Sequence, residues 1–422
     1  MRAEMDERSE RIRLSGTLLQ CLRAGIHRAV PAPTGPGAER LSLADGEKMI
    51  AIAKGHGVLP LLLRGVDRIG DGSFPPRWIE QLRSVCRVRT LECLRLTGAL
   101  LEILDLLGAG GIVAIPFKGP SLAALAYANP AMRQYGDLDI LLRREDFGRA
   151  VMLMQAAGYS VEQDRYIVSE GSARAEVPAP QPRSKFRLDY DCRLRCPARG
   201  IPVELHWRMI PWYFGPPLGV GAGGRPPRSV DLGGRSVQTL PVEDLLIYVC
   251  MHGMKHCWDK FLLVYDVAAL VDSCGDEIDW VHLGERAAGL GVGRMVGVGL
   301  RLAEDLLGVA HPSSEHTALA NNPDVARIAS DLRPRLLSSL GWESPRDSLP
   351  LVGHTASGIV FHLRAKERLR DRFRYCLGMG IGVALEASRR EFIGERVRFL
   401  FDRVGWRGAS QTRRRPSPPA RG

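Results

Sequence analysis

The feature that most constrains the fold is a block of short apolar segments, at about residues 110–210, between two long stretches of helical pattern. Residues 112–117 form an apolar run between glycines, and residues 137–142 form a second run. Both runs are typical of buried strands. Residues 185–191 and 201–207 are strand-like as well. Segments this short predict a small sheet.

Helical patterns surround this block. Residues 47–64 and 78–107 carry Leu, Ile and Val at spacings of three and four, and the chain is again helical from Val242 to about residue 405. The fold class expected is therefore α+β, a small mixed-sheet core flanked by helical regions. The expected organisation is an N-terminal helical region (1–108), an α/β core (109–214), a Gly/Pro-rich linker (215–240), a C-terminal helical region (241–407) and a disordered basic tail (408–422).

Composition narrows the cellular setting. No run of eighteen residues is apolar throughout, and the N-terminus lacks the apolar segment of a secretory signal, so we expect a cytoplasmic protein without integral membrane association. The nine cysteines include no Cys-x-x-Cys pair, which is typical of reduced thiols. Cys192, Cys196 and His206 give only an incomplete zinc ligand set.

The net charge of +11 argues only weakly for a nucleic-acid partner. Only seven of the 58 basic residues are lysines, and five arginines lie in the last sixteen residues, where there is no acid. The basic segment 389–407 fits a helix docked on the body of the protein, or one that binds a membrane surface or a partner. Nucleic acid is therefore an unlikely partner that the charge does not exclude.

Two acids stand in the second apolar run. Asp137 and Asp139 are two residues apart, so on a strand their carboxylates project from the same face, about 7 Å apart. Like charges on a half-buried face repel each other, and a divalent cation such as Mg²⁺ compensates them well. The alternative is a solvated edge strand with two ordinary aspartates.

Further groups lie on either side of this pair. Upstream, the first strand leads into Lys118, Gly119 and Ser121 and then a helix, an arrangement that presents backbone N–H groups to an anion or is simply a helix start. Downstream, Glu204 and His206 share one face of the strand at 201–207. Glu204 is thus either a third site carboxylate or an exposed acid paired with an arginine.

Taken together, these motifs are recognisable. The segment that carries most of them is FKGPSLAALAYANPAMRQYGDLDILLRREDF, which VELHW and LLIYVCMHGMKHCWDKFLLVYDVAALV follow downstream. Over about residues 95–310 the chain resembles the uncharacterised nucleotidyltransferase family of bacteria, a branch of the DNA-polymerase-beta-like nucleotidyltransferase fold.

The resemblance implies a reaction and a set of site residues. Asp137 and Asp139 would hold Mg²⁺ or Mn²⁺, with Glu204 as the third acid of the catalytic and metal site. Gly119 and Ser121 would form the phosphate-binding turn for an NTP co-substrate. In better-known relatives a Gly-Ser pair stands closer to the two aspartates, whereas here Pro120 and a longer segment intervene. The expected activity transfers an NMP from the NTP to an unidentified acceptor hydroxyl or amine.

Other basic residues are candidates for phosphate binding. Lys118 and Arg133 could neutralise phosphates, although Arg133 could instead pin the loop before the strand. His252, His256 and Lys260 have the spacing of one helical stripe, which we expect to face the nucleotide, with Lys260 or the nearby Lys255 near the phosphates. The alternative is a domain interface.

Two further classes of function compete with the enzyme. One is a catalytically inactive relative that senses nucleotide or acts as a scaffold. The other is a nucleic-acid polymerase, but the sequence shows no basic stretch interleaved with aromatic residues that would bind a nucleic-acid strand. The presence of all three acids favours the enzyme, because an inactive site has no need to tolerate their mutual repulsion. If Asp137 and Asp139 hold the metal, Asn at either position should abolish turnover. Because each substitution removes a repulsion, it should leave the thermal midpoint unchanged or raised.

Overall fold

The computed structural model describes residues 2–26, 42–70, 72, 74–127, 129–162, 190–219, 225–340 and 356–387. Two of the expected features, the basic helix at 389–407 and the tail at 408–422, lie outside these residues, as does most of the expected strand at 185–191.

A five-stranded mixed sheet forms the centre, in the order β1-β2-β5-β4-β3. β2 pairs in parallel with β5, and the other neighbouring strands pair antiparallel. This confirms the small mixed sheet of an α+β fold. The strands are β1 (Ala114–Pro116), β2 (Leu138–Leu142), β3 (Ser160–Val161), β4 (Asp191–Cys196) and β5 (Ile201–His206).

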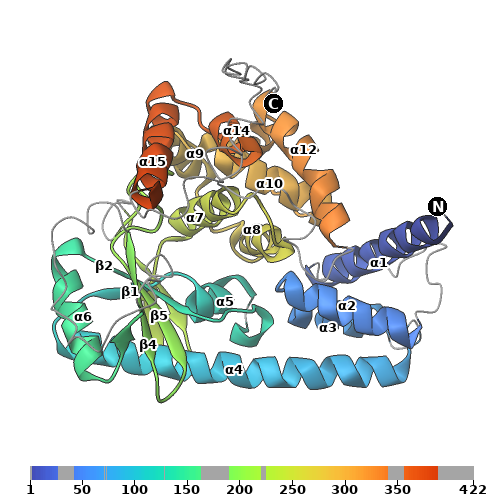
Figure 1. Ribbon diagram of the computed structural model, residues 1–422, viewed down its shortest axis with the longest axis horizontal. Coiled ribbons are helices and arrows are strands. Elements are labelled where there is room, and N and C mark those ends of the chain that lie inside the picture. The colour runs from blue at the N-terminus through green and yellow to red at the C-terminus, as the bar shows by residue number, and fades with distance from the viewer. Residues whose placement is uncertain are drawn as a thin grey trace, which may run out of the picture.

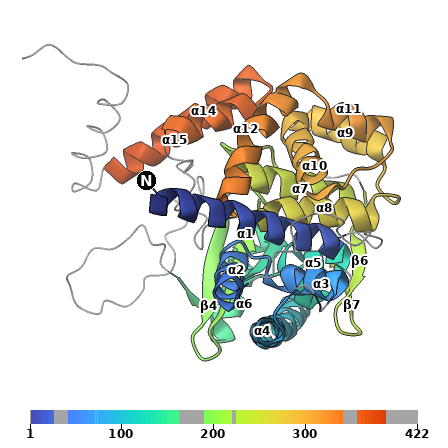
Figure 2. The same cartoon turned by 90° about the vertical axis from the view of Figure 1, so that its right-hand side faces the viewer.

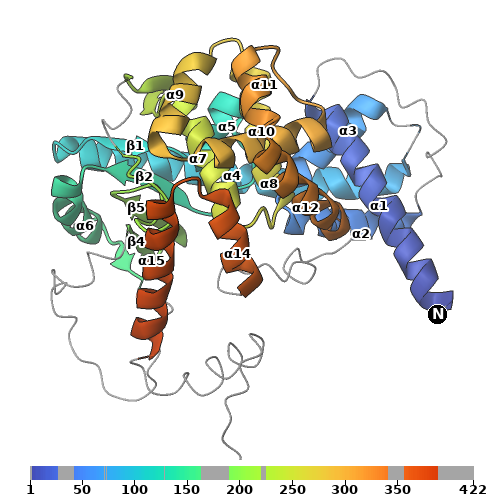
Figure 3. The ribbon, with the colours of Figure 1, turned by 90° about the horizontal axis from the view of Figure 1, so that it is seen from above.

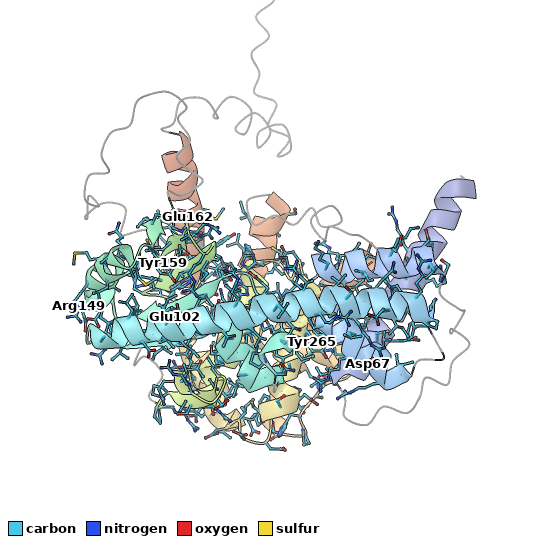
Figure 4. The ribbon with its side chains drawn as sticks, turned by 90° about the horizontal axis from the view of Figure 1, so that it is seen from below. Asp67, Glu102, Arg149, Tyr159, Glu162 and Tyr265 are labelled. Atoms are coloured by element: carbon cyan, nitrogen blue, oxygen red, sulfur yellow. The ribbon has the colours of Figure 1, made fainter. Side chains whose placement is uncertain are left out.

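One face of the sheet packs on α4 (Pro76–Ala109) and α6 (Phe147–Ala156). Leu138, Ile140 and Leu142 enter this core because alternate residues of β2 point to the same side. The residues between them, including Asp139, therefore face the other side. Figure 4 shows α4 crossing the whole lower face, from the end near Asp67 to the end near Arg149.

The N-terminal helices are α1 (Arg2–Ile26), α2 (Leu43–Gly55) and α3 (Leu59–Ile69). The single helix expected at 47–64 is two helices, because Gly57 takes a φ of +73° between them. Figure 2 shows α1 lying across α2 and α3, above the end of α4.

The C-terminal region is helical, as expected. It contains α7 (Val242–Lys255), α8 (Phe261–Cys274), α9 (Trp280–Leu290), α10 (Gly293–Leu307), α11 (Ser314–Ala320), α12 (Pro323–Ser339), α14 (Ala356–Ala365) and α15 (Leu369–Ala387). Figure 1 shows α7 and α8 above the sheet and α5 (Gly119–Tyr127). Seen from above in Figure 3, the sheet and α6 lie at the opposite end of the molecule from α1.

The helix expected from Val242 to residue 272 is interrupted. α7 ends at Lys255, and Cys257 and Trp258 take positive φ values of 51° and 55° before α8 begins at Phe261. Both of these side chains are buried, at 2% and 0% exposure, so tertiary packing stabilises a backbone conformation that such residues rarely adopt. The prediction that His252, His256 and Lys260 form one helical stripe is therefore wrong.

The two helical regions share one hydrophobic core. Leu18 of α1, Leu62 of α3, Leu246 of α7 and Leu300 of α10 all belong to a single buried cluster. The N-terminal helices thus pack directly on the C-terminal ones and frame the sheet from one side.

The Gly/Pro-rich stretch expected as a linker contains a hairpin, β6 (Arg228–Asp231) and β7 (Ser236–Thr239). Gly233 and Gly234 make its turn with positive φ values of 65° and 84°. The Thr239 hydroxyl donates to the Pro116 carbonyl at 2.7 Å and so attaches the hairpin to β1. Within the described ranges, no helix has both the length and the apolar character needed to cross a bilayer.

The contact between α1 and α3 gives a test of the packing. A Cβ on Gly65 would lie 1.9 Å from the Cys21 carbonyl oxygen, whereas a Cβ on Gly98, within α4, would meet nothing within 4 Å. We expect Gly65→Ala to lower the free energy of unfolding by about 2 kcal/mol or more through overpacking. Gly98→Ala should leave it unchanged or raise it by up to about 1 kcal/mol. Urea denaturation of both variants measures this, and equal stabilities would contradict the close approach of the helices.

Candidate active site

The parallel pairing of β2 and β5 places two acids side by side. Asp139 and Glu204 are register partners on these strands, and the face that carries them is opposite the α4–α6 core. Asp139 is only 3% exposed, and Asp137, one residue before β2, is half-buried. Alternation accounts for the face that each acid occupies, and the pairing of β2 with β5 brings Asp139 and Glu204 together, as the family resemblance implies.

Lys118 reaches these acids from the turn between β1 and α5. Its Nζ lies 2.8 Å from Asp139 Oδ1. Gly119, which begins α5, has a φ of +53° and packs against the backbone of Asp137. A residue with a side chain would be strained at this positive φ. The turn that Gly119 makes directs the Lys118 side chain toward the sheet. The Ser121 hydroxyl is buried and donates to the Lys118 carbonyl at 2.9 Å, so it serves the turn itself.

His206 completes a compact group of possible metal ligands. Its Nε2 lies 3.0 Å from Asp139 Oδ1 and 3.4 Å from Glu204 Oε2. Asp139, Glu204 and His206 each offer one ligand atom, and these atoms all lie within 4.8 Å of one another. From the sequence, His206 shares a strand face with Glu204 but is considered as a ligand only in the incomplete zinc set with Cys192 and Cys196, although its two-residue spacing from Glu204 is the signal for this group. Two carboxylates and an imidazole fit a divalent cation.

A basic side chain also contacts Glu204 from the neighbouring strand. Arg193 is the register partner of Glu204 on β4, and its Nε lies 2.9 Å from Glu204 Oε1. This is the arginine pairing considered as the alternative for Glu204. Because Arg193 is 54% exposed at its side chain, the pair borders solvent. Glu204 therefore has one oxygen toward Arg193 and the other toward His206.

The two aspartates differ strongly in acidity. Burial, and next the Asp139 carboxylate, raise the pKa of Asp137 to about 6, against the effect of Lys118. Burial would also raise the pKa of Asp139, but the Lys118 ammonium and His206 together hold it well below its usual range. Burial lowers the pKa of His206, and its hydrogen bonds to Asp139 and Glu204 outweigh this, raising it to about 9.

One side of α7 covers the acids. Lys255 Nζ lies 2.7 Å from the Tyr190 hydroxyl and 5.0 Å from the centre of its ring. Burial, and next the charge of Lys118, lower the pKa of Lys255 to about 8. His252 stacks on Tyr248 with ring centres 5.6 Å apart, and Lys118 Nζ lies 5.5 Å from the Tyr248 ring. Lys255 and His252 thus face the acid cluster.

Arg133 makes a buried ion pair with Asp266, although its charge still acts on Asp137 and Asp139. Its Nε and one terminal nitrogen each donate to Asp266 of α8 at 2.8 Å, and the Tyr127 hydroxyl donates to the same carboxylate at 2.6 Å. This bidentate contact uses the fork that phosphate would need. The geometry thus favours the structural role considered for Arg133, which is to hold the loop before β2 against α8.

His256 and Lys260 lie farther along the chain than the helix that covers the acids. His256 is exposed at the C-terminal cap of α7, with its ring 4.6 Å from that of His252. Lys260 is exposed at the N-cap of α8 and lies close enough to His56 to contribute to its lowered pKa, for which burial is the largest cause. Since His56 follows α2, Lys260 faces the N-terminal helices and not the sheet.

The site can bind a divalent cation, because two carboxylates stand on adjacent strands. It can also bind a phosphorylated ligand, because a strand–turn–helix unit directs a lysine at these acids. The profile of a protein family described as uncharacterised nucleotidyltransferase matches residues 42–308. The chain therefore belongs to this family, and its family region includes α2 to α4, which begin before the expected resemblance at about residue 95. No curated protein and no solved structure matches the chain.

The ion pairs revise what is expected of the two aspartate variants. Asp139→Asn would leave the Lys118 ammonium and His206 without their shared carboxylate, so the free energy of unfolding should fall by about 3 kcal/mol or more. Asp137→Asn should instead stabilise the metal-free protein, because it removes a buried negative charge that the Asp139 carboxylate repels. Chemical denaturation in a chelating buffer measures the free energy of unfolding of both variants. Equal changes in the two variants would contradict the different environments of Asp137 and Asp139.

The effect of Asp137→Asn should depend on pH. The pKa of Asp137 is about 6 in the folded protein and about 4 in an unfolded chain, so the folded state binds the proton more tightly. Ionisation of Asp137 therefore costs stability as the pH rises from about 4 to about 6. The gain from Asp137→Asn should be absent at pH 4 and complete above pH 7. A gain that does not change with pH would contradict the raised pKa.

Proposed function

We propose that the chain is a metal-dependent nucleotidyltransferase of the DNA-polymerase-beta-like type, which moves an NMP from an NTP to an acceptor hydroxyl or amine. The observation that carries this proposal is the convergence of Asp139, Glu204 and His206 within 4.8 Å, with Lys118 at 2.8 Å from Asp139. Membership of a nucleotidyltransferase family supports the same class of reaction.

Asp139 and Glu204, with His206 beside them, would hold the cation, and Mg²⁺ or Mn²⁺ suits a carboxylate-rich set. Asp137, expected from the sequence as a further ligand, lies close enough to Asp139 and Glu204 for their charges to raise its pKa, but it is not one of the three grouped ligands. When bound, a divalent cation would align the acceptor with the α-phosphorus and neutralise charge on the leaving pyrophosphate. The carboxylates stand on paired strands backed by the α4–α6 core, so their positions are fixed before any ligand binds.

The proton of the acceptor needs a base. In the transfer, the acceptor oxygen or nitrogen bonds to the α-phosphorus, the bond to the β-phosphate oxygen breaks, and the acceptor loses a proton. Asp137 suits this role, because a pKa of about 6 leaves it ionised at neutral pH yet basic enough to accept a proton. Asp139, with its lowered pKa, is a poorer base.

Lys118 and Lys255 are the cations that we assign to the phosphates. Both are directed toward the acid cluster, one from the β1–α5 turn and one from the end of α7. Gly119 gives the backbone close access to this region, whereas Pro120 supplies no N–H. Arg133 would support the site indirectly by fixing the loop before β2 through Asp266.

One observation favours the alternative, an inactive relative that binds nucleotide without turnover. Asp139 and Glu204 both have basic partners already, in Lys118, His206 and Arg193. Such pairs can stabilise a fold that no longer needs a metal. Asp137, whose pKa is raised by burial and next by the Asp139 carboxylate, favours catalysis, because a purely structural site gains nothing from a second buried acid beside the first.

The direct test is transfer of label. We expect the protein, with NTPs labelled at the α-phosphate, Mg²⁺ or Mn²⁺ and a cell extract as source of acceptor, to release pyrophosphate and form a labelled product. Glu204→Gln and Asp139→Asn should reduce the transfer at least about a hundredfold, the scale of losing electrostatic stabilisation of the transition state. Nucleotide binding without transfer under all conditions would support the inactive alternative.

The lysine assignment has its own test. Lys255→Met should raise KM for the NTP about tenfold or more and change kcat little, as expected for loss of one charge-assisted contact made equally in the ground and transition states. Lys260→Met is the matched control, since Lys260 faces His56 instead of the acids. If the control variant raises KM and Lys255→Met does not, the assignment of the two lysines is reversed.

A further inference from the structure

A single oxygen at the centre of the site accepts two charged contacts. Asp139 Oδ1 lies 2.8 Å from Lys118 Nζ and 3.0 Å from His206 Nε2. Asp139 belongs to the group of possible metal ligands, and its side chain is only 2% exposed. The Lys118 ammonium thus occupies one of the positions next to this oxygen that a bound cation could take.

The charges of the cluster balance without a metal. Asp139 and Glu204 contribute two negative charges, and Lys118 and Arg193 contribute two positive charges in direct contact with them. Protonated His206, which contacts both carboxylates, adds one more positive charge, against the one negative charge of the nearby Asp137. A divalent cation entering this arrangement adds two more positive charges at short range. Its binding is therefore opposed as long as Lys118 remains on Asp139.

The backbone of Lys118 is held in place by its turn, whereas its ammonium group lies near two aromatic rings. Ser121 bonds its carbonyl, and Gly119 fixes the turn after it. The ammonium lies 5.6 Å from the Phe117 ring and 5.5 Å from the Tyr248 ring, and its side chain is 16% exposed. The ammonium can therefore change partner without movement of the strand, and a phosphate close by would offer it a stronger acceptor.

We propose that Lys118 is a built-in counter-ion of the metal site, which keeps the affinity for divalent cations low until a nucleotide's phosphates draw the ammonium away from Asp139. This inference rests on the proposed function and adds a coupling between nucleotide and metal. Linkage makes the coupling reciprocal: nucleotide raises the affinity for metal, and metal raises the affinity for nucleotide by the same factor.

Metal binding without turnover tests the proposal. Binding of Mn²⁺ is measured by electron paramagnetic resonance on full-length protein, first without nucleotide and then with a mixture of the four α,β-methylene nucleoside triphosphates. Lys118→Met should bind Mn²⁺ at least about tenfold more tightly than wild type without nucleotide, because one close positive charge is gone. With the analogues bound, the two proteins should bind Mn²⁺ with affinities that differ by less than about twofold, since the ammonium has already left Asp139.

Lys260→Met is the matched control, since it removes the same charge from a lysine that lies near His56 instead of the acids. Its Mn²⁺ affinity without nucleotide should stay within about twofold of wild type, because its charge is farther from the ligand atoms. An equal gain in both variants, or no gain in Lys118→Met, would overturn the inference. Lys118→Gln repeats the test if the Met variant does not fold.

The outcomes for this inference and for the proposed function are distinct. Label transfer by wild type together with unchanged Mn²⁺ affinity in the Lys118 variants overturns the counter-ion and leaves the enzyme standing. A failure of both proteins to bind Mn²⁺, with and without the analogues, overturns both. In wild type, thermal midpoints give a second measurement, and Mn²⁺ with analogue should raise the midpoint more than the sum of the two separate shifts.

Discussion

The parallel pairing of β2 with β5 is the interaction on which the rest of the site depends. It sets Asp139 beside Glu204 on one face, while Leu138 and Ile140 on the other face anchor the strand in the α4–α6 core. Packing of the apolar face thus provides the stability that allows two carboxylates to stand close together. The basic side chains around them, from the β1–α5 turn, β4 and β5, then neutralise charge that the strand pairing alone would leave unbalanced.

The helical regions act as one body around this sheet. Because α1 to α3 share a core with α7 and α10, the N-terminal helices support the position of α7 over the acids. The buried contact between Arg133 and Asp266 adds a second attachment, from the loop before β2 to α8. The site is therefore formed between the sheet and the C-terminal helices, with α5 and its preceding turn between them.

The sequence predicted what depends on local periodicity. The alternation in β2 and β5 placed Asp139 and Glu204 on their faces, and the fold class followed from short apolar runs between helices. The pairing of β2 with β5 is a contact over some sixty residues, and alternation carries no information about which strands become neighbours. For the same reason Asp266 could not be identified as the partner of Arg133.

The error at Lys260 has a different cause. The helical spacing of the sequence continues through Cys257 and Trp258, but both residues have positive φ values that neither residue type indicates. Packing of the buried Trp258 against Gly253 and Gly299 favours the break, and that packing is a property of the whole fold. In the Gly/Pro-rich stretch, composition suggested a linker, although Val230 and Val237 pair across a glycine turn.

The central claim is that the acids on β2 and β5 bind a divalent cation next to the phosphates of a nucleotide. A crystal structure of the protein with Mn²⁺ and an α,β-methylene nucleoside triphosphate tests it most directly, because anomalous scattering locates the ion. We expect an anomalous peak about 2.0–2.2 Å from oxygens of Asp139 and Glu204, with Lys118 Nζ on a phosphate. An ion elsewhere, or a nucleotide bound with Lys118 still on Asp139 and no ion beside it, would contradict the account.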